Sequence, residues 1–183
     1  TAEAEFALAL SYFNFGSYDD AIASCRSAIR SNPNFDQAYL LTGRAYARMK
    51  KTNEATVALR KAASIHPGCE QCDLHLALVL LDKGDESEAL RLLREAIRLN
   101  PANASAHYQL GKTLAQRKEN SEAVAELEKA VELDPSQDRA CYQLGRLYLT
   151  LGDKARSQMY FDKVRDLKEK RLAVSQEHLS QRK

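Results

Sequence analysis

Apolar residues recur at helical spacing along the chain, in paired stretches separated by a short break. A proline follows the second stretch in the first four pairs. Because proline lacks an N–H group and disfavours helix in the residue before it, each proline is expected to end a helix. The four prolines, spaced at intervals of 34 residues, are Pro33, Pro67, Pro101 and Pro135. This pattern predicts an all-α protein of five tandem helix–turn–helix repeats.

Small residues recur in the same register. One small position in each first helix holds Ala9, Gly43, Ala77, Gly111 and Gly145. Small residues let two helices approach closely, and large residues of the neighbouring helix fill the space beside them. One hairpin cannot bury both of its apolar faces, so the repeats should stack around a continuous core. The repeats are expected at about residues 2–35, 36–69, 70–103, 104–137 and 138–167.

Local signals place the ends of the helices. The breaks inside the repeats fall near Gly16, Lys50, Gly84, Lys118 and Gly152. Ser17 with Asp20, and Asp85 with Glu88, have the spacing of capping boxes at the start of second helices. No proline or glycine follows Gly152, and good helix formers continue to the end of the chain. Residues 168–183 are therefore expected to extend the last helix as a polar segment.

The period and its landmarks resemble those of the tetratricopeptide repeat (TPR) family. The resemblance runs from about residue 2 to about residue 167, and the fifth repeat keeps it without its proline, through Leu144, Gly145, Tyr148 and Phe161. The opening tryptophan of the family pattern is replaced by Glu5, Tyr39, Asp73, His107 and Cys141. The resemblance implies a right-handed superhelical solenoid. Its first helices would line a concave groove that binds an extended peptide or a helix of another protein.

Helical position then selects the candidate groove residues. The set is Gln37, Leu41, Arg44, Arg48, His75, Leu78, Gln109, Lys112, Arg139, Gln143 and Arg146. Five of these residues are permanently positive, whereas the predicted face holds only two acids, Glu3 and Asp82. Arginine can donate forked hydrogen bonds to carboxylates, so the groove is expected to bind an acidic partner segment. The alternative is that these charges only solvate a helix face.

Composition narrows the classes of partner. The chain has 183 residues, 44% of them hydrophobic and 28% charged, and its formal net charge is +2. This charge is too small to indicate a nucleic-acid surface, and Tyr108 and Tyr142 are the only groove aromatics that could stack on bases. The longest apolar run, residues 76–81, is far shorter than the roughly 18 residues of a membrane span. No signal peptide opens the sequence. We therefore expect a soluble protein without nucleic-acid or membrane partners.

One short segment could carry other chemistry. His66, Cys69, Cys72 and His75 are spaced three residues apart and could supply four zinc ligands. The two cysteines alone could form a redox pair at a helix start. We interpret the pair as incidental and expect no metal, because His66 closes one helix while His75 should point into the groove. The four cysteines do not form a secretory disulfide framework, which favours the cytoplasm.

Two functions remain after this reading. The sequence contains no nucleophile–base set and no glycine-rich phosphate loop, so we expect neither catalysis nor a cofactor. The first function is a scaffold that holds another protein. The second is a structural module that self-associates into a homo-oligomer through its long C-terminal segment and its apolar N-terminal face, at Phe6, Leu10 and Phe13.

Overall fold

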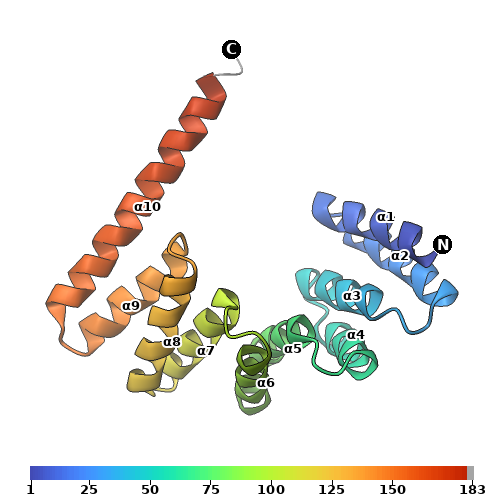
Figure 1. Cartoon of the computed structure of the whole chain (residues 1–183), viewed down its shortest axis with the longest axis horizontal. Helices are drawn as coiled ribbons and strands as arrows, with labels where there is room; N and C mark the ends of the chain where they lie inside the picture. The colour runs from blue at the N-terminus through green and yellow to red at the C-terminus, as the bar shows by residue number, and fades with distance from the viewer. Residues whose placement is uncertain (181–183) are drawn as a thin grey trace. The chain divides into compact units, whose positions relative to one another are not determined.

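The computed structural model describes residues 1–180, and of residues 177–180 only the backbone. Within this range the chain forms ten α-helices and no strand, as the sequence pattern predicts (Figure 1). The helices are α1 (Ala2–Phe15), α2 (Tyr18–Ser31), α3 (Asp36–Arg48), α4 (Thr52–Ile65), α5 (Glu70–Lys83), α6 (Glu86–Leu99), α7 (Ala104–Gln116), α8 (Asn120–Leu133), α9 (Asp138–Thr150) and α10 (Lys154–Ser180). None of these helices is both long enough and apolar enough to cross a bilayer.

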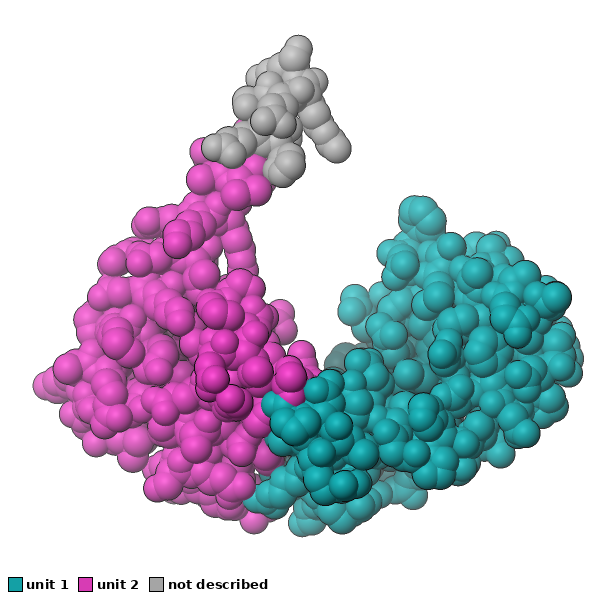
Figure 2. Space-filling model, viewed as in Figure 1, with its two compact units in different colours: residues 1–101 teal, residues 102–183 magenta. Residues whose placement is uncertain are grey.

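The helices form two compact units, Thr1–Pro101 and Ala102–Lys183 (Figure 2). We call them unit 1 and unit 2. Unit 1 contains the hairpins α1–α2, α3–α4 and α5–α6, and α2 packs on α3 as α4 packs on α5. Unit 2 contains the hairpins α7–α8 and α9–α10, with α8 packed on α9. Each unit is therefore a stack of hairpins in which the second helix of one repeat contacts the first helix of the next.

The turns inside the hairpins share one backbone conformation. One residue directly after the first helix of each repeat, at the C-cap or the next position, has a positive φ, between 60° and 90°. This left-handed conformation suits glycine, which has no Cβ, and strains other residues. The five residues are Gly16, Lys50, Gly84, Lys118 and Gly152, the same positions at which the sequence pattern breaks. Two of the five hairpins therefore make this turn with a lysine.

Helix caps differ from the prediction. Ser17 and Asp85 are the N-cap residues of α2 and α6, but neither side chain accepts a capping hydrogen bond. The expected capping boxes are therefore wrong in their hydrogen bonding, although the helices begin where they were placed. Side-chain caps occur instead at first helices, where Asn103 accepts from the N–H of Ala106 at 3.0 Å.

Close helix contact explains the small residues. A Cβ added to Gly43 would lie 2.5 Å from Cγ of Leu59, and one added to Gly111 would lie 2.8 Å from Cγ of Leu127. Both distances are far below van der Waals contact, so the two helices of these hairpins pack glycine against leucine. At the matching position of other repeats, Ala9 is fully buried.

The last helix continues past the end of the fifth repeat. α10 runs from Lys154 to Ser180 without a break, which confirms the expected extension through residue 180. Residues 181–183 of the predicted segment lie outside the described residues. In the first turn of α10, Ser157 stands where the earlier repeats have alanine, and its hydroxyl donates to the carbonyl of Gly145 at 2.8 Å. This hydrogen bond lets a polar residue fill a buried position.

Candidate functional site

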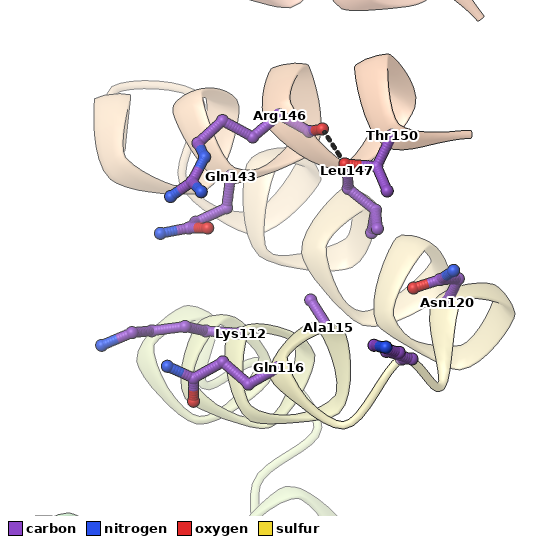
Figure 3. Close-up of a pocket in the computed structure, with 9 residues that line it drawn as sticks. Lys112, Ala115, Gln116, Asn120, Gln143, Arg146, Leu147 and Thr150 are labelled. Atoms are coloured by element: carbon purple, nitrogen blue, oxygen red, sulfur yellow. Dashed lines mark hydrogen bonds between the residues drawn. The ribbon is translucent and has the colours of Figure 1, made fainter. Parts of the chain in front are cut away.

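A groove of about 720 Å³ lies between α7 and α9 of unit 2 (Figure 3). The turn after α7 and the start of α8 complete its lining. The lining residues are Lys112, Ala115, Gln116, Lys118, Asn120, Gln143, Arg146, Leu147 and Thr150. We call this space the main groove. Three of its residues, Lys112, Gln143 and Arg146, belong to the predicted set.

The main groove is lined by cations and amides. Lys112, Lys118 and Arg146 carry positive charge, and none of the described residues that line the groove is a carboxylate. Within the described part of the chain, none of the three cations forms an ion pair. Figure 3 shows the polar ends of Lys112 and Gln116 from α7 reaching the same side as Arg146 from α9. The groove therefore has positive charge and hydrogen-bond donors free to meet a ligand.

A smaller pocket of about 270 Å³ adjoins the main groove and shares Gln143 with it. Its walls combine two aromatic rings, one acid, two cations and an aliphatic residue. They are Tyr108, Asp138, Arg139, Tyr142, Gln143, Val164 and Lys168. We call it the side pocket.

The charges of the side pocket are not balanced. The carboxylate of Asp138 is engaged by Arg171 at 2.9 Å, whereas Arg139 and Lys168 form no ion pair within the described residues. Tyr142 is 47% exposed and its ring lies 5.9 Å from that of Phe161. The pocket therefore offers an apolar wall beside free positive charge.

The predicted residues of unit 1 form a separate cationic cluster. The guanidinium of Arg44 lies 4.9 Å from the centre of the Phe13 ring, and that of Arg48 lies 5.8 Å from the Tyr18 ring. Such cation–π contacts restrain both arginines. Burial, and then the charge of Arg48, lower the pKa of Arg44.

His75 lies close enough to this cluster for the charge of Arg44 to act on it. Burial, and secondly the positive charge of Arg44, lower the pKa of His75 to about 4, while Glu70 opposes the shift. His75 is therefore neutral at physiological pH. The carboxylate of Asp82, near the end of α5, lies 3.1 Å from the ammonium group of Lys50 in the turn after α3. One of the two acids predicted for the groove is therefore already paired.

One predicted groove residue is misplaced. Leu41 is only 2% exposed and belongs to the core of unit 1, where Phe6 and Phe35 pack against the same cluster. A buried side chain cannot contact a partner, so its assignment to the groove is wrong. Gln37 is exposed and Leu78 and Gln109 are half-buried, but none of the three lines either pocket, and their roles stay predictions.

Sequence reasoning also missed residues of both pockets. Lys118 and Asn120 line the main groove from the α7–α8 turn, and Lys168 reaches the side pocket from α10. Helical position predicts groove residues only on first helices, so this prediction does not include residues of turns or second helices. The spacing of Lys168 after Val164 on one face of the last helix was the available signal.

The cysteine segment differs from its interpretation. Cys69 and Cys72 are joined by a disulfide, so the reading of the pair as incidental is wrong. His66 is hydrogen-bonded to Asp36, with its Nδ1 2.8 Å from the carboxylate oxygen. Among the described residues, no group of three or more His, Cys, Asp or Glu side chains could hold a metal ion. Cytosolic disulfides are usually transient and take part in exchange, so the cytoplasmic location stays a prediction.

Solved structures with this fold include several TPR proteins. MamA from Desulfovibrio magneticus RS-1 is 22% identical over 92% of this chain and 96% of its own, with a TM-score of 0.80. PilW, a type IV pilus biogenesis factor, is 23% identical over 92% of this chain and 78% of its own, with a TM-score of 0.83. YrrB is 23% identical over 91% and 86% of the two chains, with a TM-score of 0.71. At these identities the likeness shows the fold alone.

Sequence families are more specific. No curated protein sequence matches the chain significantly. A tetratricopeptide repeat model matches residues 138–171. The model of the cytochrome c-type biogenesis protein H TPR domain matches residues 17–141, which is more than half of the chain. The chain therefore belongs to this family of tetratricopeptide repeat domains.

Proposed function

We propose that this chain is a protein-binding scaffold whose main groove takes an acidic segment of another protein. The observation that carries the proposal is a set of three cations, Lys112, Lys118 and Arg146, which have no ion pair and no neighbouring carboxylate among the described lining residues of the groove. A groove with this lining suits binding rather than catalysis, since it brings together cations, amides and apolar side chains.

Carboxylates suit this groove for a physical reason. The guanidinium of Arg146 can bind a carboxylate through two parallel hydrogen bonds, while each lysine acts as a point charge. One exposed ion pair contributes only about 0.2–1 kcal/mol, so three cations acting together are needed for useful affinity. The amides of Gln116 and Gln143 add donors that depend less on salt. Binding should therefore weaken, without vanishing, as ionic strength rises.

The side pocket provides an anchor for the same segment. Arg139, Gln143, Arg146 and Thr150 recur along one face of α9, at spacings of four, three and four residues. They span about 16 Å, the length of about five residues of extended chain. A segment lying along this face would place one aromatic or aliphatic side chain between Tyr108 and Tyr142, with a carboxylate beside Arg139 or Lys168.

Unit 1 offers a second contact of the same kind. Arg44 and Arg48 are held over aromatic rings, so little side-chain entropy is lost when they bind a carboxylate. The structural relative YrrB is described as a TPR protein with an unusual peptide-binding site, which supports a peptide as the ligand class.

Peptide selection tests this function. A random peptide library displayed on phage is selected against the chain, and we expect enrichment of Asp and Glu next to an aromatic or aliphatic residue. Lys112→Glu combined with Arg146→Glu should abolish binding of the selected peptides. The matched control is Lys154→Glu with Lys170→Glu, which makes the same charge change at exposed residues outside both pockets. Peptides without acidic enrichment, or equal loss in the control, would refute the proposal.

A second function, self-association, is favoured by the exposed face of α1. Leu8 is 46% exposed, whereas its equivalents Leu110 and Leu144 in later repeats are buried at 1% and 0%. Phe15 on the same helix is 87% exposed. A second copy of the chain could cover this face. Light scattering over a range of protein concentrations separates the two functions, because a monomer at every concentration excludes self-association.

A further inference from the structure

The Cys69–Cys72 disulfide has no counterpart in the other four hairpins. Cys69 is the N-cap of α5, a position that Asn103 and Gln137 hold in later repeats. Cys72 stands where those repeats have a fully buried alanine, Ala106 or Ala140. Since neighbouring hairpins form with these residues, the repeat does not need the bond. The disulfide is an addition to the fold at one place.

The two sulfur-bearing residues differ in access. Cys69 is half-buried and follows an exposed turn formed by Pro67 and Gly68, whereas Cys72 has no exposed surface. Gly68 has a φ of 87°, in the left-handed region that glycine adopts without strain. Of the two cysteines, only Cys69 has exposed surface from which a thiolate could approach the bond. In thiol–disulfide exchange the rate depends on which sulfur is attacked, and attack on Cys69 makes the buried sulfur of Cys72 the leaving group.

The helix start also supports a thiolate on Cys69. Its Sγ accepts a hydrogen bond from the backbone N–H of Cys72 at 3.1 Å. The N-terminus of α5, a helix of 14 residues, adds the positive end of its dipole. Two neighbouring groups do not stabilise a thiolate on Cys69. The negative charge of Glu70 disfavours it, and His66 is already hydrogen-bonded to Asp36. The backbone contact is therefore the local group that stabilises the reduced sulfur.

We propose that the Cys69–Cys72 disulfide is a thiol–disulfide exchange site for a protein dithiol. One thiolate of the dithiol attacks Sγ of Cys69, the Cys69–Cys72 bond breaks, and its electron pair leaves on Sγ of Cys72. The second thiolate of the dithiol then attacks its own sulfur in the mixed disulfide and releases Cys69. The dithiol is oxidised to a disulfide, and Cys69 and Cys72 are reduced, taking up the two protons that the dithiol lost.

The reactivity of single-cysteine variants tests which sulfur is attacked. In a Cys72→Ser variant the remaining Cys69 should react with 5,5′-dithiobis(2-nitrobenzoate) at least about tenfold faster than the buried Cys25 and Cys141. In a Cys69→Ser variant, Cys72 should react no faster than those two buried thiols. Equal reactivity of Cys69 and the buried thiols would overturn the proposal.

The unmodified chain gives a test that does not depend on variants. Mixed in equal amounts with a reduced peptide that holds two cysteines two residues apart, the oxidised chain should convert the peptide to its disulfide, with matching loss of the Cys69–Cys72 bond. Mass spectrometry follows both products. A chain that keeps its disulfide in the presence of excess reduced peptide carries a structural bond, and the proposal is then wrong.

Discussion

Arg171, in the second half of α10, lies 2.9 Å from the carboxylate of Asp138, the first residue of α9. The same guanidinium donates to the carbonyl oxygen of Ser136 at 2.7 Å. These contacts join positions more than 30 residues apart and hold the extension of the last helix against the start of the preceding one. They also engage Asp138, the one acid among the described residues of the side pocket, which leaves Arg139 and Lys168 free for a ligand.

Removing this contact should loosen the end of α10. Arg171→Ala is expected to speed amide hydrogen exchange over residues 168–176, because all of these residues are exposed. The exposed pair contributes about 0.2–1 kcal/mol, so overall stability should hardly change. Arg165→Ala is the control, since Arg165 pairs with Asp162 inside the same helix. Unchanged amide hydrogen exchange in Arg171→Ala would show that this part of α10 stays helical without the Arg171–Asp138 contact.

Lys118 links stability to binding. Its φ of 64° strains a residue with a Cβ, so Lys118→Gly should raise the free energy of unfolding by about 1 kcal/mol. The same change removes one cation from the main groove and should weaken binding of acidic peptides. Urea denaturation and peptide titration measure the two effects.

Lys50→Gly provides the comparison. Lys50 also has a positive φ, 60°, but lies in unit 1. Its replacement by glycine should raise the free energy of unfolding, although the loss of the weak ion pair with Asp82 will offset part of the gain. Binding in the main groove should be unchanged. A loss of peptide binding in Lys50→Gly would contradict the assignment of the groove to unit 2.

Gly111 tests the close contact inside a hairpin. A Cβ at this position would lie 2.8 Å from Cγ of Leu127 and 3.0 Å from the carbonyl oxygen of Ala123. Alanine would gain about 1 kcal/mol in helix propensity, but overpacking typically costs about 1–3 kcal/mol. We expect Gly111→Ala to lower stability by about 1 kcal/mol in urea denaturation. Ala77→Gly, at the matching position, should cost about as much through propensity alone; a stabilised Gly111→Ala would show that the helices separate easily.

His75 makes stability depend on pH. Its pKa is lowered from 6.5 to about 4 in the fold, mainly by burial, so between these values the unfolded chain binds more protons than the folded chain. Stability should therefore fall as the pH drops from 6.5 toward 4, by on the order of 2–3 kcal/mol. Thermal or urea melts at several pH values measure this slope.

His75→Gln isolates this contribution. The variant should lose less stability than the parent chain over the same pH range, because glutamine does not titrate. Carboxylates that protonate near pH 4 act equally in both proteins, so the difference between the two curves belongs to His75. Parallel curves would mean that the histidine is as hydrated in the fold as in the unfolded chain.

The sequence by itself determined the helices and their turns. Apolar spacing, the 34-residue interval and the breaks at Gly16 or Lys118 are local properties of the chain, and the structure has its helix ends at these places. It also indicated that cations gather on first helices, since Lys112 and Arg146 do line one groove. Charge and helical position are readable without knowing which side chains meet.

Only the tertiary structure decided which side chains are open to a partner. Leu41 followed the expected helical face, yet packing in unit 1 buries it, because neighbouring positions on a helix differ in burial by small rotations. Lys168 joins the side pocket, and Cys69 bonds to Cys72, because folding brings particular atoms together in space. Periodicity fixes the side of a helix on which a residue lies, whereas the distance between two side chains depends on how the helices pack.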